Sequence, residues 1–473
     1  MTAMIRNLAL HTRAIRWAVE LHCKAIWIAL RCLLTLQFPR VARRVFGIAT
    51  EGGTTDGMPS LLIVSYYAPP YSSKYGTQRI TKFAKYLAAM GWKVVFLVTN
   101  PRQSYETDLH AEPLPENVEV VRLDAIPRHP FFGEGVFAPD DFVFCVPQFS
   151  SAIERILGER HIDLVLATMP PYSVGLAAAA ATVRAGVPLV SDFRDPWNRI
   201  DNSWVMKSRV ARRLSQAMER AVLKTSEAVV MVSELRFFAD YFLTDDEKVR
   251  AKTVSIRNGY DDDDFVDADA ALANISSVPD SNGFSISYAG VLYNEENVTN
   301  ILRVLDVFRE RYPEAARHLV FEYAGASSAM LSSRTDLPVS VRDHGFLTHR
   351  AANLMRARSA VQLFALPATY HAHVSTGKIF EMVRVGVPIL ALTHPGGTVA
   401  RLIAETRTGC AFDPLDAQAA CDALKRMFDQ WKARGHVDYA PDLSSVQAYS
   451  RMSLTSSLAE VLAAVVERRR AAR

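Results

Sequence analysis

The stretch Tyr370–Leu392, YHAHVSTGKIFEMVRVGVPILAL, decides the fold. It predicts a loop, a helix that begins in VSTGK, a turn at Gly386 and Pro388, and a buried strand over 387–392. An apolar run such as VPILAL is typical of a parallel strand that is covered on both faces. Strands and helices in this order belong to a doubly wound α/β domain, which binds ligands at the carboxyl ends of its strands.

The start of that helix has the chemistry of an anion site. Ser375 or Thr376 can cap the helix, and Gly377 lets the backbone approach a ligand closely. Free N–H groups and the positive end of the helix dipole suit a phosphate, and Lys378 adds a full charge in the first turn. Glu381 follows one turn later. On local features alone, an ordinary helix N-terminus with a surface lysine remains an open alternative.

Length and composition limit the class of protein. A chain of 473 residues predicts roughly two or three domains. The net charge of +4 is uneven, because residues 1–46 carry eight Arg and Lys against one Glu. The rest of the chain has a net charge of −3, which excludes a basic nucleic-acid-binding body. Five irregularly spaced cysteines without a CxxC pair indicate a reducing compartment and give no zinc signature, so we expect no metal.

The N-terminal segment, residues 1–57, is predicted to be a basic amphipathic helix over 5–46 followed by a linker from Glu51. Charges interrupt it too often for a bilayer span or a signal peptide. Basic residues together with Trp17 and Trp27 favour the surface of an anionic membrane, which predicts a cytoplasmic protein peripheral to the inner face. Two alternatives stay open: the helix packs on the body or on a partner chain, or the true start lies near Met58.

Residues 58–257 predict a first Rossmann-like domain. A strand over 61–67, a glycine-bearing loop to Gly76, a helix over 77–90 and a strand over 92–99 form a βαβ unit. The aromatic stretch 131–149 is expected to be irregular. Further strands are expected at 118–123, 163–167, 187–192 and 228–232, with helices at 173–185 and 208–225.

Residues 258–440 predict a second Rossmann-like domain, and residues 441–473 a C-terminal helix that packs back toward the first. The four aspartates after Tyr260 lack calcium-loop spacing and are interpreted as a solvated linker. Two such domains in tandem predict a ligand cleft between them. Strands are expected at 284–289, 319–324, 339–346 and 360–364, and helices at 298–311, 350–357, 396–405, 417–432 and 445–473.

Several motifs, in this order and spacing, resemble those of a known family. They are LLIVSYYAPP before the Gly76 loop, ATMPPYSVGLAA, GVPLVSDFRDPW, IRNGYD, YAGVLY, HGFL and STGKIFE, and they cover the chain from about Leu61 onward. The chain resembles the retaining family 4 glycosyltransferases of the GT-B fold, which include bacterial polysaccharide and lipopolysaccharide transferases. The resemblance implies a sugar moved from a nucleoside diphosphate sugar to a saccharide or lipid-linked acceptor, with no bound metal or other cofactor.

The resemblance also assigns roles to residues. Glu381 stands where the family's glutamate binds the ribose, and the donor would lie against Gly290, Ser375, Thr376, Gly377 and Lys378. The backbone of Gly345, Phe346 and Leu347 would frame the base. His373 replaces the glutamate that contacts the donor sugar in the family. The implied catalytic residues are His373, Lys378 and Asp195.

Other departures leave alternatives open. No cation follows Gly290, so the charge of the leaving group must be offset elsewhere, with Lys378, Arg194 or Arg79 as candidates. Gly76, Arg79, Asp192 and Arg194 are acceptor or phosphate candidates. Asp195 either orients the acceptor or accepts its proton. Alternatively, an Arg194–Asp195 or Asp192–Arg194 ion pair only holds the loop. Two further functions compete: a sugar-nucleotide epimerase or phosphorylase on the same fold, and a catalytically idle sugar-nucleotide-binding scaffold.

Overall fold

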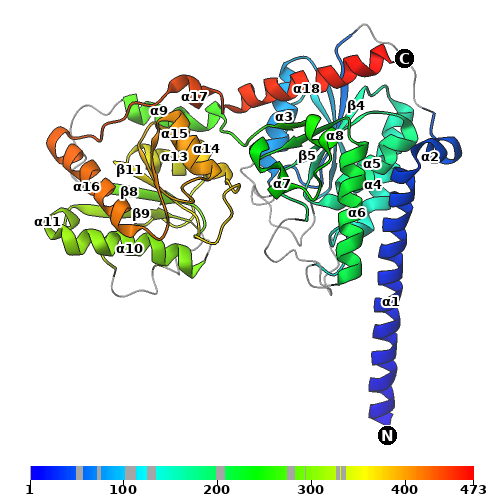
Figure 1. The fold of residues 1–473 in the computed structure, drawn as a ribbon, viewed down its shortest axis with the longest axis horizontal. Coiled ribbons are helices and arrows are strands. Elements are labelled where there is room, and N and C mark those ends of the chain that lie inside the picture. The colour runs from blue at the N-terminus through cyan, green and yellow to red at the C-terminus, as the bar shows by residue number, and fades with distance from the viewer. Residues whose placement is uncertain are drawn as a thin grey trace. The chain divides into compact units, whose positions relative to one another are not determined.

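The computed structural model divides the chain into two compact units, Met1–Ile256 with Thr455–Arg473 (unit 1) and Arg257–Leu454 (unit 2) (Figure 1). Part of the linker expected after Glu51 lies outside the described residues. So does part of the aromatic stretch 131–149. The structure describes residues 2–49, 57–71, 76–101, 113–124, 135–198, 208–273, 283–292, 294–325, 331 and 337–472, with side chains from residue 19 on.

Unit 1 is built on a seven-stranded parallel sheet with the order β3-β2-β1-β4-β5-β6-β7. Its central strands are buried along their whole length, because continuous apolar runs need cover on both faces. The strands are β1 (Ser60–Val64), β2 (Lys93–Thr99), β3 (Val118–Leu123), β4 (Leu164–Met169), β5 (Leu189–Phe193), β6 (Ala228–Met231) and β7 (Thr253–Ser255).

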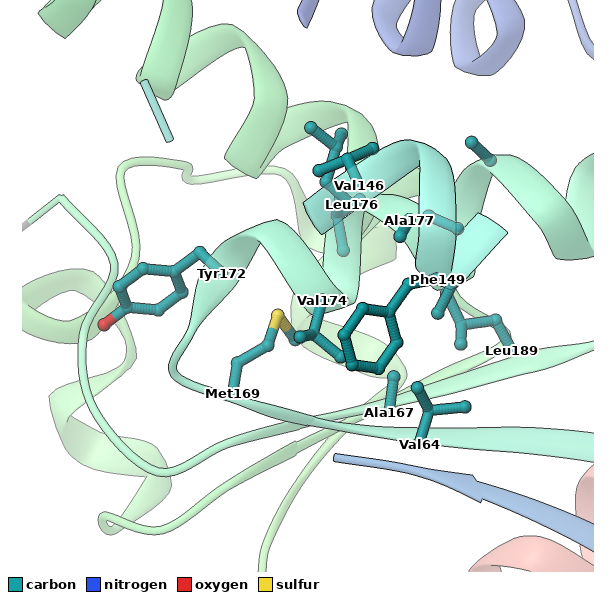
Figure 2. Close-up of a cluster of buried hydrophobic side chains, with 14 of the residues drawn as sticks. Val64, Val146, Phe149, Ala167, Met169, Tyr172, Val174, Leu176, Ala177 and Leu189 are labelled. Carbon is teal, nitrogen blue, oxygen red and sulfur yellow. The ribbon is translucent and has the colours of Figure 1, made fainter. Parts of the chain in front are cut away.

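The helices of unit 1 cover this sheet. The Ala-rich helix α5 (Tyr172–Ala185) is buried on nearly all sides. It packs against α4 (Val146–Glu159), and Figure 2 shows Phe149 of α4 beside Val174 and Ala167. The other helices are α3 (Thr77–Ala89), α6 (Arg209–Thr225), α7 (Phe238–Tyr241) and α8 (Glu247–Ala251), with 3-10 turns η2 (Val143–Cys145) and η3 (Leu235–Phe237).

The expectation that residues 131–149 are irregular is wrong at their end. Helix α4 begins at Val146, with a proline in its first turn. Proline is tolerated there because the first N–H groups of a helix have no partner inside the helix. Phe137, Phe142 and Phe144, which precede it, are buried in the core of unit 1.

The N-terminal segment forms two helices, α1 (Thr2–Gln37) and α2 (Pro39–Phe46), where the sequence predicted one. Pro39 begins α2, because it cannot continue α1 without losing a backbone hydrogen bond. The C-terminal half of α1 packs against α5 and α6, with Ile28, Ala29 and Cys32 in the core (Figure 1). Among the described residues, no helix is long and apolar enough to cross a membrane.

Unit 2 contains a six-stranded parallel sheet with the order β10-β9-β8-β11-β12-β13. Its strands are β8 (Phe284–Ala289), β9 (Leu319–Ala324), β10 (Ser340–Asp343), β11 (Val361–Ala365), β12 (Ile389–Leu392) and β13 (Gly409–Phe412). Its helices are α9 (Val266–Ala273), α10 (Glu295–Arg311), α11 (Pro313–Ala316), α13 (His349–Ala357), α14 (Gly377–Val385), α15 (Thr398–Thr406), α16 (Ala417–Arg434) and α17 (Leu443–Gln447), before α18 (Arg451–Ala471). The single helix expected over 445–473 is therefore two.

The aspartates after Tyr260 are not the solvated linker that their charge predicted. They lie in the 3-10 turn η4 (Asp262–Phe265), which the buried Asp261 caps by accepting from the N–H of Asp263. Asp262 and Asp269 both pair with Arg384, at 2.9 and 2.8 Å. Asp262 of the run is thus paired with a cation from a distant helix, although Asp262 and Asp263 are exposed.

Candidate functional site

The start of α14 lies at the carboxyl edge of the unit 2 sheet, after β11. Thr376 takes the N-cap position, but its side chain makes no capping hydrogen bond, contrary to the expected capping role. Its Oγ1 is buried and has no hydrogen-bond partner among the residues that the structure describes. A buried hydroxyl without a partner is costly, so this helix end is better suited to a polar ligand than to an empty state.

Lys378 lies across the end of β8. Its Nζ is 4.6 Å from the ring centroid of Tyr288 and 3.5 Å from the hydroxyl of that residue. Gly290 leaves the space for it, because a Cβ at Gly290 would lie 2.2 Å from Nζ and the φ of +134° disfavours other residues. Burial and the nearby Arg356 lower the pKa of Lys378 to about 7. The structure therefore brings the predicted residues Gly290 and Lys378 together.

Glu381 is held by two side chains of helix α13. Its carboxylate oxygens lie 3.3 Å from His349 Nδ1 and 3.2 Å from Arg356 Nη1. Burial raises the pKa of Glu381, but the bonds and charges of His349 and Arg356 outweigh it and lower that pKa to about 2. The hydrogen bond to Glu381 in turn raises the pKa of His349. The carboxylate is therefore ionised and fixed in one orientation.

Arg356 and His349 were missed in the sequence analysis. Arg356 is buried, and it also donates to the Asn353 side chain at 2.6 Å and to the carbonyl of Ala289 at 3.3 Å. One signal was present: His349, Asn353 and Arg356 are spaced to share one face of a helix. Buried arginines are rare, so this spacing alone did not indicate a site.

The loop after β10 contains the residues expected to frame a base. Gly345 has a φ of +63°, and its carbonyl accepts from the N–H of Gly325 at 2.8 Å, which ties the loop to the end of β9. Phe346 is 83% exposed, whereas Leu347 is half-buried. The turn thus presents one aromatic ring to solvent at the carboxyl edge of the sheet.

His373 lies in the loop before α14, where its ring stacks on that of His371 with centroids 5.4 Å apart. Ser375 is partly buried in the same loop, and Gly377 begins the helix. The expected contact of His373 with a donor sugar stays a prediction. Within the described residues, no cluster of three or more His, Cys, Asp or Glu side chains is placed to hold a metal ion.

In unit 1, Arg79 and Asp192 form a buried ion pair. Arg79 Nη2 lies 2.8 Å from Asp192 Oδ1 and also donates to the carbonyl of Ile256 at 2.8 Å. Thr168 donates to the other carboxylate oxygen at 2.8 Å. Both charged side chains are at most 2% exposed. Their burial does not support the expected ligand-binding role and explains how β4, β5 and α3 are held together.

Arg194 is likewise used within unit 1. It donates to the carbonyls of Gly76 at 2.6 Å and Met169 at 3.3 Å, and to that of Pro170. Gly76 has a φ of +69°, and a Cβ there would lie 2.0 Å from Nη1 of Arg194. Burial lowers the pKa of this guanidinium. Asp195, by contrast, is exposed on the same loop, and its expected role toward an acceptor stays a prediction.

Most of unit 1 matches a known protein family. Residues 76–259 match the model of a family described as a glycosyl transferase 4-like domain. Residues 76–259 thus form a glycosyl transferase 4-like domain. The matched residues lie in unit 1 apart from the last three, so the site in unit 2 is argued from its own geometry.

Solved structures show that the chain has the GT-B fold. Sucrose-phosphate synthase from Thermosynechococcus elongatus aligns with a TM-score of 0.60 at 14% identity, over 87% of this chain and all of its own. A glycosyltransferase from Rickettsia africae gives 0.58 at 15%, over 86% and 99%. Anabaena HepE, solved with UDP and glucose, gives 0.55 at 15%, over 85% and 99%. No curated protein sequence matches this chain significantly.

Proposed function

We propose that this protein is a retaining glycosyltransferase that moves a sugar from a nucleoside diphosphate sugar to a saccharide or lipid-linked acceptor in cell-surface polysaccharide biosynthesis. One observation carries the proposal: Lys378 and the uncapped start of α14 lie together at the carboxyl edge of the unit 2 sheet. A cation beside free helix amides is suited to a diphosphate. The structural neighbour HepE was solved with UDP and with UDP-glucose, which supports a donor of this class.

In this proposal the residues of unit 2 bind the donor. Lys378 and the amides at Gly377 hold the diphosphate, and Thr376 offers its buried hydroxyl. Glu381, fixed by His349 and Arg356, accepts hydrogen bonds from the ribose hydroxyls. The turn at Gly345–Leu347 faces the base, and His373 contacts the sugar.

The proposed chemistry is attack on the face of the sugar from which the diphosphate leaves. The acceptor oxygen bonds to the anomeric carbon while the bond from that carbon to the diphosphate oxygen breaks. The acceptor proton passes to the leaving diphosphate, or to Asp195. The protein supplies orientation and charge stabilisation, since helix amides and a cation stabilise the charge that develops on the leaving group.

We further propose that α1 and α2 attach the protein to the inner face of an anionic membrane. Opposite their buried side they expose large apolar residues at helical spacing, which we call the apolar outer face. Arg31, Arg40 and Arg44 are exposed on the same two helices, and such a combination is typical of interfacial helices. The apolar outer face consists of Ile26, Leu30, Leu34, Phe38, Val41 and Val45.

The experiment is a panel of UDP-, GDP- and ADP-sugars incubated with the protein and membrane extract, with nucleotide release and lipid products measured. Transfer of sugar to lipid or saccharide supports the proposal. Isomer exchange would indicate an epimerase, sugar phosphate formation a phosphorylase, and donor binding without turnover an idle scaffold. The Lys378→Ala variant serves as the matched negative control.

A further inference from the structure

Unit 1 contains a cavity lined by cations at the amino edge of its sheet, which is the edge opposite to Gly76 and Arg194. The cavity has a volume of about 270 Å³ and lies where β5 and β6 begin, beneath α2 and the end of α18. Its charged lining residues are Arg43, Lys224 and Arg469 against one acid, Glu227. Cations from three separate helices therefore converge on one hollow.

Two of these cations are held in place by backbone carbonyls. Arg43 Nε donates to Val183 at 3.3 Å, and Arg469 Nη2 donates to Gly186 at 2.7 Å. Gly186 has a φ of +71°, and a Cβ there would lie 3.1 Å from the Arg43 guanidinium carbon. The Nε of Arg469 is buried and has no hydrogen-bond partner among the described residues. The guanidinium groups are thus positioned, and one buried donor is left for an acceptor.

The rim of this cavity joins the apolar outer face. Leu36 and Pro39 line the cavity. Leu36 is buried on the side of α1 opposite to Leu34, but Pro39 is exposed and directly follows Phe38, which belongs to the apolar outer face and is 56% exposed. A molecule with an anionic head and an apolar tail matches both surfaces at once. Arginine is well suited to the head, because its donors pair with two phosphate oxygens.

We propose that this cavity binds the phosphate headgroup of an anionic membrane lipid, whose acyl chains lie along the apolar outer face. The proposal rests on the membrane attachment proposed above and gives it a specific headgroup contact. Free phosphate shares the head chemistry, but it leaves the apolar outer face without a partner.

The test uses the full-length protein and two double variants of equal charge. The cavity variant is Arg43→Gln with Arg469→Gln, and the control is Arg40→Gln with Arg44→Gln, which are exposed on α2 outside the cavity lining. Sedimentation with phosphatidylcholine vesicles, with and without phosphatidylglycerol, measures affinity. We expect the cavity variant to lose about tenfold or more of its affinity for anionic vesicles and the control clearly less. Equal losses would overturn the proposal in favour of diffuse charge attraction.

Soluble ligands separate the two sources of phosphate. Calorimetry with a short-chain phosphatidate below its micelle concentration should show saturable binding that the cavity variant loses, and inorganic phosphate should bind far more weakly. Equal binding of both would overturn the lipid assignment. If the cavity variant fails to fold by circular dichroism, the exposed Lys224→Gln takes its place. If the wild type does not bind vesicles, membrane attachment is refuted. The thermal shift that UDP causes in the wild type tests the donor site of unit 2 independently of that result.

Discussion

Both sheets carry cations at their carboxyl edges, but the two edges use them differently. In unit 1, Arg79 is buried against Asp192, and Arg194 donates to three backbone carbonyls. In unit 2, Lys378 lies over a tyrosine ring at a helix end without a side-chain cap. The buried hydroxyl of the nearby Thr376 has no hydrogen-bond partner within the described part of the chain. At the edge of unit 1, the cations are bound by groups of the protein itself. At the edge of unit 2, the hydroxyl of Thr376 is available for a ligand.

The difference teaches that a charged residue at a strand end is not by itself a sign of a ligand site. Arg79 and Arg194 stabilise the fold, because their bonds to carbonyls and to a carboxylate offset the free-energy cost of removing the guanidinium groups from water. Lys378 is desolvated by burial, and its pKa falls to about 7. A group held in an unfavourable state by its surroundings is a better candidate for function than one that is satisfied.

The largest expected effect comes from breaking the buried ion pair between Arg79 and Asp192 in unit 1. Arg79→Met leaves Asp192 buried without its cation, so we expect about 3–5 kcal/mol less free energy of unfolding. Urea denaturation followed by circular dichroism measures this loss. Arg155→Met, which breaks an exposed pair with Glu159 on α4, is the control and should cost about 1 kcal/mol or less. If both variants cost the same, the buried pair does not hold the fold.

The next effect concerns catalysis. Lys378→Ala removes the cation proposed to stabilise the leaving diphosphate, so we expect kcat/KM to fall by about 2–4 kcal/mol of transition-state stabilisation. Steady-state nucleotide release with the preferred donor checks this. Lys432→Ala, on the exposed side of α16, is the control. Unchanged turnover in the Lys378 variant would remove the assigned role.

A third prediction concerns stability against pH. The pKa of Lys378 is about 7 in the folded protein against the ordinary 10.5, so the unfolded chain binds more protons between these values. The unfolding free energy of the donor-free protein should therefore rise with pH across this window. Lys378→Met removes that slope and should stabilise the protein at pH 7 by about 1–3 kcal/mol, less than the full pKa difference because the side chain is partly solvated.

Denaturation series at several pH values, with and without UDP, test this balance. UDP should raise the stability of the wild type more than that of the variant, since only the wild type gains an ion pair. Identical pH profiles for the two proteins would mean that the lysine is not strained in the free protein.

The sequence indicated the strands and the start of α14 because continuous apolar runs and a glycine-bearing helix start are local patterns. It did not indicate which charged groups would meet. Arg79 and Asp192 are 113 positions apart, and Glu381 is 25 positions from Arg356. Such pairings depend on the order of strands in the sheet. Helix α4 was missed for another reason: its proline and the aromatic residues before it hide the helical period.

The smallest expected effect concerns Phe346, the exposed aromatic residue in the loop after β10. Truncation to alanine should leave stability unchanged, because an 83% exposed ring buries little area. If the ring stacks on the base, donor affinity should weaken by about 1 kcal/mol, or roughly fivefold. Titration with UDP by calorimetry measures this, and Leu415→Ala, another exposed apolar truncation in unit 2, is the control. Equal affinity in all three proteins would mean that the base lies away from this loop, and the donor would then be oriented by the start of α14 and Glu381 alone.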